Sequence, residues 1–442
     1  LQAAGGGQRF KFNLLTQKSQ IEANKIAFDH ANVPEYAFEK AGVVFNFSTD
    51  FLENWGNPVE NARRFTDMHV YKNGRKNKFI HISPQVSLTG AKADRWIVIN
   101  PGTEGLVALA IASVIQKENG TYKFLKKYLQ AYSPEKVAEA TGVSAETLSE
   151  LAIDAMEHGP LLALGGGNVS ATDQSVETLV GVNILNAVSG ALNKTVLFSD
   201  QTTTESSTHQ DLTQLISDLN GGKIKLLIVD DSNPVYALPP SMGFLQALKK
   251  TFVVSLASQK SETTHTANLV LPALTAYESW GDAFPRNGVR SIQQPVMSTV
   301  NMFDARARED ILLSVAQNVN KKAFSENSSY LDYLQNIWQK IQRKVGDRRK
   351  FDSFWISVLE NGGIFEKPKF IRASLNRRVA SVKLNDPGMA SSDGLTLFPT
   401  TSLLLGDGGG ANKPWLQEVP DPMSQIVWDS WVEINPDTAQ KL

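Results

Sequence analysis

The chain has 442 residues, of which 42% are hydrophobic and 20% are charged, and its formal net charge is -1. This composition is typical of a globular protein long enough for two or three domains. The balanced charge argues against a nucleic-acid-binding protein, which needs a basic surface. The chain contains no cysteine, which excludes a disulfide, a thiolate zinc site or an iron–sulfur cluster held by these residues alone.

Strands alternate with helical patterns along the chain, and this alternation predicts a mostly parallel sheet covered by helices. In the first part, apolar runs predict strands at 41–47, 78–82 and 96–99. A helix follows over 103–115, with Thr103 as its N-cap. We interpret residues 1–155 as a first α/β domain.

A second series of the same kind begins after Gly159. Polar residues follow its strands in an order similar to that of the first series, which indicates an internal duplication of one nucleotide-binding design. The predicted second domain covers residues 156–300. Its predicted elements are strands at 161–164, 195–198, 226–230, 251–256 and 268–272 and a helix over 173–188.

The remaining chain is predicted to be less regular. We interpret 301–390 as a helical or irregular extension and 391–442 as the truncated start of a β-rich domain, opened by residues 431–436. The longest apolar run, 106–115, is too short to span a bilayer. The chain begins at Leu1 without a signal-peptide pattern, and we expect it to be part of a longer protein. The extension carries one apolar helical stripe, formed by Leu331, Leu334, Ile337, Trp338 and Ile341.

The stretch LLIVDDSNPVYALPP, residues 226–240, reads as a buried strand that ends in polar side chains. Open α/β sheets bind ligands at the carboxyl ends of their strands, so Asp230 and Asn233 are candidate ligand-binding residues. The same pattern also serves as a simple turn. Asp230 and Asp231 are adjacent in sequence, and we expect their side chains to diverge, as successive side chains of a strand do.

The stretch LALGGGNVS, residues 162–170, predicts a strand, a glycine-rich turn and the start of a helix, an arrangement that can bind an anion. Ser170 stands where the dinucleotide-binding fingerprint has its third glycine. Asp200 lies about thirty residues past the glycines, where the fingerprint places its acidic residue after about twenty. Two interpretations therefore stay open, NAD binding and a tight turn. The six histidines are never two or four residues apart, so no compact metal site is predicted.

Several motifs, in this order along the chain, resemble the molybdopterin oxidoreductase (dimethyl sulfoxide reductase) superfamily. They are GVVFNFSTDFLENWGNPVE (42–60), SLTGAKADRWIVINPGTEG (87–105), LIVDDSNP (227–234), SETTHTANLVLPALTAYESWGD (261–282) and NKPWLQEVPDP (412–422). The resemblance covers most of the chain, with a poorer match over residues 310–390. It implies two Rossmann-like, three-layer α/β domains related by a pseudo-twofold axis.

In that superfamily, strand-end motifs hold the guanosine ends of two pterin dinucleotides. The resemblance places this cradle at Asp50, Ser83, Gly102, Thr103, Glu104, Gly166, Asp230, Asn233, Glu278 and Asp282. This sequence departs from the usual residues, since Ser83 replaces an acidic residue, Gln85 an arginine, Glu104 an aspartate, Asp282 a threonine and Pro285 an asparagine. Each change removes or moves a contact that a buried dinucleotide needs. We therefore expect an empty cradle, and no catalytic residue or metal ligand is assigned.

Within the superfamily, the chain is similar to the molybdopterin-like (ActB) subunits of alternative complex III, a quinol-oxidising membrane complex. The resemblance implies a scaffold without a cofactor, peripheral on the periplasmic face of the bacterial inner membrane and not inserted in it. Its expected partners are the other subunits of the respiratory complex and a ferredoxin-like part of the same polypeptide that holds iron–sulfur clusters. No nucleic acid is expected.

Two alternatives stay open. One is a catalytic molybdenum or tungsten bis-pterin subunit, similar to polysulfide or tetrathionate reductase, which would hold molybdopterin guanine dinucleotide. Its metal ligand would lie outside these residues. The other is a Rossmann-type NAD-binding protein, which depends only on the glycine-rich turn.

Overall fold

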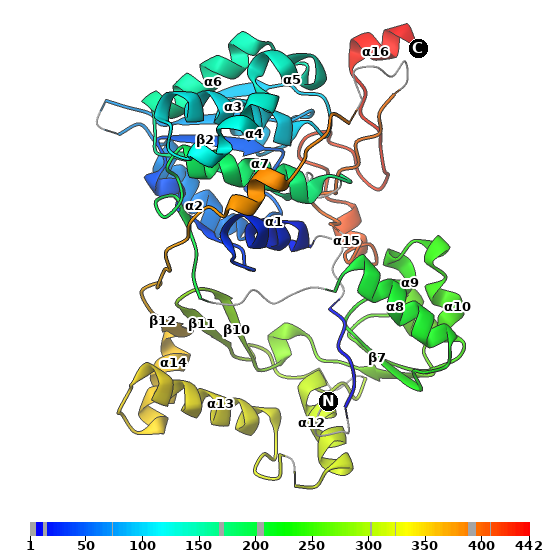
Figure 1. The fold of residues 1–442 in the computed structure, drawn as a ribbon. Coiled ribbons are helices and arrows are strands. Elements are labelled where there is room, and N and C mark those ends of the chain that lie inside the picture. The colour runs from blue at the N-terminus through cyan, green and yellow to red at the C-terminus, as the bar shows by residue number, and fades with distance from the viewer. Residues whose placement is uncertain are drawn as a thin grey trace. The chain divides into compact units, whose positions relative to one another are not determined.

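The computed structural model describes residues 6–11, 16–72, 74–167, 172–200, 207–300, 303–322, 324–387, 395–406 and 408–442 (Figure 1). The chain forms two compact units. The larger unit comprises Leu14–Phe198 and Ile371–Leu442, and the smaller unit comprises Leu1–Asn13 and Ser199–Phe370. Each is described by itself below. Both contain a parallel sheet with helices, so the fold class is mixed α/β.

The larger unit is built on a four-stranded parallel sheet in the order β4-β3-β2-β5. Every residue of the central strand β2 is buried, which suits its sequence VVFNF because β-branched and aromatic side chains pack well on a pleated surface. The predicted strands at 41–47, 78–82 and 96–99 are confirmed with small shifts. The strand bounds are Val43–Phe47 for β2, Lys78–Ile82 for β3, Arg95–Ile97 for β4 and Leu161–Gly165 for β5.

Two apolar helices, α3 and α7, pack closely in this unit. A Cβ on Gly181 would lie 3.2 Å from the carbonyl oxygen of Gly105, so glycines allow the two backbones to approach. The predicted helices over 103–115 and 173–188 are confirmed as α3 and α7. The helices of this part are α1 (Lys18–Phe28), α2 (Pro58–His69), α3 (Glu104–Asn119), α4 (Lys126–Leu129), α5 (Pro134–Thr141), α6 (Ala145–Glu157) and α7 (Ser175–Val188).

The structure corrects the predicted boundary between two domains near residue 156. Strand β5 pairs with β2 in the first sheet, whereas the sequence analysis assigned it to a second sheet. The predicted strand at 195–198 is reduced to β6 (Val196–Leu197), which pairs antiparallel with β1 (Glu35–Tyr36). Strand order is set by long-range pairing, which a pattern of alternating elements does not reveal.

The smaller unit contains a three-stranded parallel sheet in the order β7-β8-β9. The three predicted strands are confirmed, but the expectation that β7 is buried is wrong. Leu226 is 54% and Ile228 is 41% exposed in that strand. The bounds are Leu226–Asp230 for β7, Phe252–Ala257 for β8, Leu269–Pro272 for β9, and His209–Asn220, Pro234–Ala237, Phe244–Leu248 and Glu262–Thr266 for α8 to α11.

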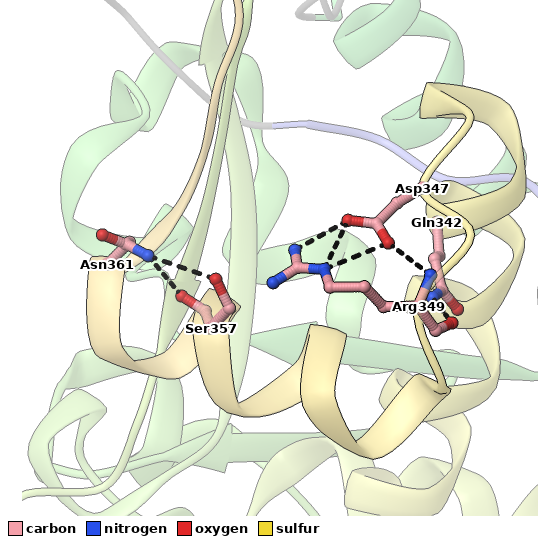
Figure 2. Close-up of polar contacts among 5 residues, drawn as sticks. All are labelled: Gln342, Asp347, Arg349, Ser357 and Asn361. Atoms are coloured by element: carbon pink, nitrogen blue, oxygen red, sulfur yellow. Dashed lines mark hydrogen bonds and ion pairs between the residues drawn. The ribbon is translucent and has the colours of Figure 1, made fainter.

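An antiparallel sheet, β10-β11-β12, and three helices complete the smaller unit. The predicted stripe on 331–341 is confirmed, because Leu334, Trp338 and Ile341 are buried in one core with residues of α14. Arg349 holds the turn between α13 and α14, with its guanidinium on the Asp347 carboxylate at 2.7 Å (Figure 2). The bounds are Gly281–Arg286, Val289–Gln293 and Gly363–Phe365 for β10 to β12, and Arg308–Val319, Tyr330–Val345 and Phe351–Asn361 for α12 to α14.

The C-terminal residues return to the larger unit. The predicted strand at 431–436 does not form, because 431–435 are irregular and Pro436 begins α16 (Pro436–Lys441). In the described part of 391–442 the other regular features are α15 (Pro414–Gln417) and an isolated bridge between Ser402 and Gly406. No helix among the described residues is long and apolar enough to cross a membrane.

Candidate functional site

Three polar side chains meet at the carboxyl ends of the strands in the larger unit. Ser48 follows β2, Ser83 follows β3, and Glu104 begins α3. The hydroxyl oxygen of Ser48 lies 2.8 Å from Oε1 of Glu104 and 3.1 Å from Oγ of Ser83, within hydrogen-bonding distance of both. Ser48 has a φ of 50°, which L side chains rarely adopt. The network therefore fixes an unusual turn and brings two predicted residues, Ser83 and Glu104, together.

The carboxyl group of Glu104 is fully enclosed, with an exposed fraction of 0%. The hydroxyl of Ser48 donates a hydrogen bond to Oε1, while Oε2 has no hydrogen-bond partner among the described residues. Burial raises the pKa of Glu104 above its ordinary value, and the hydrogen bond from Ser48 opposes this shift. The surroundings thus favour the neutral carboxylic acid over the carboxylate.

Gly102 and Thr103 form the turn that leads into α3. Gly102 has a φ of 80°, in the region that favours glycine. Thr103 is the N-cap residue, as predicted, but its hydroxyl donates to the carbonyl oxygen of Asn100 at 2.6 Å instead of capping the helix. Thr103, like Glu104, is completely buried. The turn therefore directs its polar groups into the protein.

The glycine-rich turn after β5 lies against the loop that contains Asp50. Gly166 has a φ of 142°, and a Cβ built on it would lie only 2.5 Å from Nε1 of Trp55. The indole of Trp55 therefore packs directly on the Gly166 backbone. Asp50 is buried, and its carbonyl oxygen accepts the amide of Trp55 at 3.2 Å. Residues 168–171 of the predicted turn, with Ser170, lie outside the described residues.

A buried pair beside this network was missed by the sequence analysis. Asn46 on β2 lies opposite His81 on β3 in the parallel register, with Nδ2 2.9 Å from Nδ1 of the imidazole. Burial lowers the pKa of His81 to about 4. The ring is therefore neutral, and its protonated Nε2 donates to the carbonyl oxygen of Gln85 at 3.3 Å. The signal in the sequence that could have identified this pair is the presence of a polar residue, Asn46 or His81, within each of two strands predicted from apolar runs.

In the smaller unit, the two carboxylates after β7 share one guanidinium. Nη1 of Arg308 lies 3.4 Å from Oδ1 of Asp230, and Nη2 lies 3.3 Å from Oδ2 of Asp231. The expectation that these side chains diverge is wrong, because Asp231 lies beyond the strand with a φ of 43°. Burial raises the pKa of Asp230, and the charge of Arg308 opposes the shift. This cluster holds the start of α12 beside the sheet.

The other predicted residues of the smaller unit also bind their own neighbours. Oδ1 of Asn233 accepts from the amide and the hydroxyl of Thr263, at 3.1 and 2.7 Å. Glu278 accepts from the hydroxyl of Thr275 at 2.9 Å. Oδ2 of Asp282 accepts from the indole N–H of Trp338 at 3.2 Å, and burial raises the pKa of Asp282. Asn233 and Asp282 therefore each connect two elements of this unit, whereas Glu278 caps the start of its own turn.

The structure argues against NAD binding at the glycine-rich turn after β5. The NAD-binding fingerprint requires an acidic residue at the end of the parallel strand beside the first one. Asp200 instead follows β6, which pairs antiparallel with β1 in a separate two-stranded sheet. The neighbour of β5 in its own sheet is β2. Among the described residues, no group of three or more histidine, aspartate or glutamate side chains could hold a metal ion.

Comparisons with known proteins agree with the fold. The model of the molybdopterin oxidoreductase family matches residues 5–318. The chain is similar to the menaquinone reductase, molybdopterin-binding-like subunit, of Nitratidesulfovibrio vulgaris, with 28% identity over 303 residues that make up 63% of this chain and 43% of that protein. It is also similar to the alpha subunit of the F420-dependent formate dehydrogenase of Methanocaldococcus jannaschii, with 24% identity over 83% of this chain and 62% of that protein.

Among solved structures, the fold is similar to that of acetylene hydratase from Pelobacter acetylenicus. The TM-score is 0.56 at 16% sequence identity, and the match covers 71% of this chain and 52% of that chain. The likeness therefore concerns the fold alone. The chain spans about half the length of the proteins that it matches.

Proposed function

Since the chain belongs to the molybdopterin oxidoreductase family, we propose that it forms a non-catalytic scaffold in a respiratory complex that exchanges electrons with a quinone. The name of the Nitratidesulfovibrio vulgaris relative, a molybdopterin-binding-like subunit of a menaquinone reductase, supports this role. The finer form of the proposal is quinol oxidation in a complex similar to alternative complex III. In that form the subunit is peripheral and lies on the periplasmic face of the membrane.

The enclosure of Glu104 is the observation that carries the proposal. A guanine base would need polar groups that it can reach and that are free to bond. The carboxyl of Glu104 is fully buried, and Ser48 already bonds it. Ser83 is 2% exposed and belongs to the same network. The hydroxyls of Ser48 and Ser83 and Oε1 of Glu104 bond one another, and Oε2 of Glu104 is enclosed, so these side chains do not fit a pterin dinucleotide.

The indole of Trp55 supports the same conclusion. A dinucleotide pyrophosphate approaches the backbone of a glycine-rich turn directly, because glycine has no side chain in the way. Here Trp55 occupies that approach at Gly166. We propose that this cradle holds no pterin and that electrons pass through clusters elsewhere. The chain contains no cysteine, so those clusters belong to a ferredoxin-like part of the subunit or to its partners.

The experiment compares the Ser83→Ala variant with wild type in the whole complex, isolated from its own host. Quinone-linked electron transfer is measured per assembled complex. The scaffold proposal predicts unchanged activity, because Ser83 then contacts only neighbouring residues of the chain. A catalytic molybdenum or tungsten subunit predicts a large loss, because Ser83 would then contact the cofactor. Ser149→Ala is the matched control, since Ser149 bonds the carbonyl oxygen of Ala145 within α6.

A further inference from the structure

The end of α13 and the turn that follows it carry a dense group of cations. Residues 340–352 contain six lysine or arginine side chains and two aspartates, a net charge of +4 in a chain whose formal net charge is -1. All six cations are exposed. We call this group the basic turn, and its members are Lys340, Arg343, Lys344, Arg348, Arg349 and Lys350.

The backbone of the basic turn is held by the contacts of one member. Among the described residues, Arg349 is the only one of the six cations with an ion-pair partner, the Asp347 carboxylate (Figure 2). Asp347 also accepts the backbone amide of Arg349 at 2.9 Å, and the buried Gln342 donates to the carbonyl oxygen of Arg349 at 2.8 Å. The turn is therefore fixed, while the other five cations remain exposed on it.

Folding does not account for this clustering of charge. The N–H groups of Gly346 and Asp347 already donate to the last carbonyl oxygens of α13, at 3.2 and 3.1 Å, so the helix is capped without a cation. Lys350 is the N-cap residue of α14, where the positive end of the helix disfavours a cation. Like charges held close together also repel one another. The basic turn therefore costs stability, which points to a role in binding.

The cations are arranged to meet a broad anionic surface. Lys340, Arg343 and Lys344 are three and four residues apart, so they lie on one face of α13. Arg348 and Lys350 follow directly in the turn, and the N-terminus of α14 adds its own positive partial charge. The basic turn thus presents several cations together, without a pocket that would select one small anion.

The surroundings of the basic turn favour lipid headgroups over an acidic protein. A specific protein interface buries aromatic or apolar anchors at its centre. Among the described residues from 320 to 355, no large apolar side chain is exposed. Groups of about four to eight lysine or arginine side chains bind anionic lipids through charge alone. We propose that the basic turn binds the anionic headgroups of a phospholipid membrane.

Flotation of the full-length protein with lipid vesicles tests this proposal. One set of vesicles contains equal parts of phosphatidylcholine and phosphatidylglycerol, and the other contains phosphatidylcholine alone. The protein should bind only the first set. Changing the three lysines of the basic turn to glutamine (Lys340→Gln, Lys344→Gln and Lys350→Gln) should weaken this binding at least about tenfold, because each cation near an anionic surface contributes to it. The pair of Arg349 and Asp347 stays in place in this variant.

The matched control removes the same charge at dispersed positions. Lys92→Gln, Lys249→Gln and Lys321→Gln change three exposed lysines that lie far apart in sequence, and this variant should bind the vesicles as wild type does. Equal weakening by both variants would overturn the proposal. So would no binding of wild type to the phosphatidylglycerol vesicles, which is the result expected if the basic turn binds an acidic protein surface. Neither result depends on whether the cradle holds a pterin.

Acylation of lysines in the wild-type protein covers the case in which the triple variant does not fold. An amine-reactive acetylating reagent is applied with and without phosphatidylglycerol vesicles, and the modified peptides are quantified by mass spectrometry. The vesicles should slow the reaction of Lys344 and Lys350 and leave that of Lys92 and Lys249 unchanged. Equal rates with and without vesicles at Lys344 and Lys350 would overturn the proposal.

Discussion

Ser48 and Glu104 are hydrogen-bonded across 2.8 Å, and both side chains are closed off from solvent. They come from the turn after β2 and the start of α3, so the bond joins two strand-end segments of one sheet. Strand ends of this kind are where related α/β folds bind ligands. In this protein the polar groups at that edge bind one another, and the following predictions test that relationship.

Replacing Glu104 by glutamine keeps the shape of the side chain and removes its titration. The folded state raises the pKa of Glu104, so this residue favours folding below its ordinary pKa of 4.5, and that contribution is lost as the pH rises through the folded-state pKa. The free energy of unfolding of Glu104→Gln relative to wild type should therefore increase with pH. Urea unfolding across that range measures the difference, and a difference independent of pH would contradict the prediction.

Replacing Glu104 by alanine should destabilise the protein by about 2–3 kcal/mol, because it leaves a cavity and removes the partner of a buried hydroxyl. Glu139→Ala on α5 is the control, since Glu139 is exposed. The control should change the free energy of unfolding by less than about 0.5 kcal/mol. Equal effects of the two substitutions would mean that the Ser48–Glu104 bond does not stabilise the packing of the turn after β2 against the start of α3.

The neutral state of His81 predicts a second dependence on pH. Burial lowers its pKa from 6.5 to about 4, so the unfolded chain binds a proton in that window while the folded protein does not. Stability should fall as the pH decreases from 6.5 towards 4, by up to about 3 kcal/mol. The His81→Gln variant should lose this dependence, whereas His209→Gln, at an exposed position, should keep it. Urea midpoints at several pH values decide between these outcomes.

The contact between Gly166 and Trp55 predicts a steric cost. Gly166→Ala places a methyl group against the indole at a φ of 142°, and it should lower the free energy of unfolding by more than about 2 kcal/mol. Gly120→Ala is the matched control, because Gly120 also has a positive φ, 62°, but open space around it. It should cost only about 1 kcal/mol. Adding Trp55→Phe should recover part of the loss at Gly166, and no recovery would contradict the proposed contact.

Arg308 should stabilise the smaller unit through Asp230 and Asp231. Arg308→Met leaves two neighbouring carboxylates without their shared cation, and the expected loss is about 1 kcal/mol because all three groups are partly exposed to water. Arg306→Met removes a more exposed pair with Asp304, at 3.8 Å, and should cost almost nothing. The difference between the variants should shrink at high salt. A difference that does not change with salt would point to packing rather than charge.

Local sequence patterns predicted most single elements but not how they assemble. An apolar run such as 78–82 forms a strand when a neighbouring strand is present to pair with it. Nothing within the run at 161–165 indicates that it pairs with β2 rather than with a later strand. The burial of β7 was mispredicted for the same reason, since an apolar sequence shows what a strand can bury and not whether a cover is present.

The family resemblance named Ser83 and Glu104 as cradle residues, and that role stays a prediction. In the structure Ser83 follows β3, Glu104 begins α3, and the two belong to one hydrogen-bonded network. The closing contacts came from residues that the sequence analysis did not assign to the site, namely Ser48, Trp55 and His81. Their roles depend on a positive φ, an indole over a glycine and a register match across two strands. None of these three features is visible in a linear pattern.

The central claim is that this family member carries no pterin cofactor, and metal and pterin analysis of the whole protein tests it most directly. The protein is isolated from its own host, and molybdenum, tungsten and iron are quantified by mass spectrometry, with pterin measured as its fluorescent oxidation product. The account predicts iron from clusters elsewhere, without molybdenum, tungsten or pterin. Molybdenum or tungsten near one atom per chain, together with pterin, would contradict it.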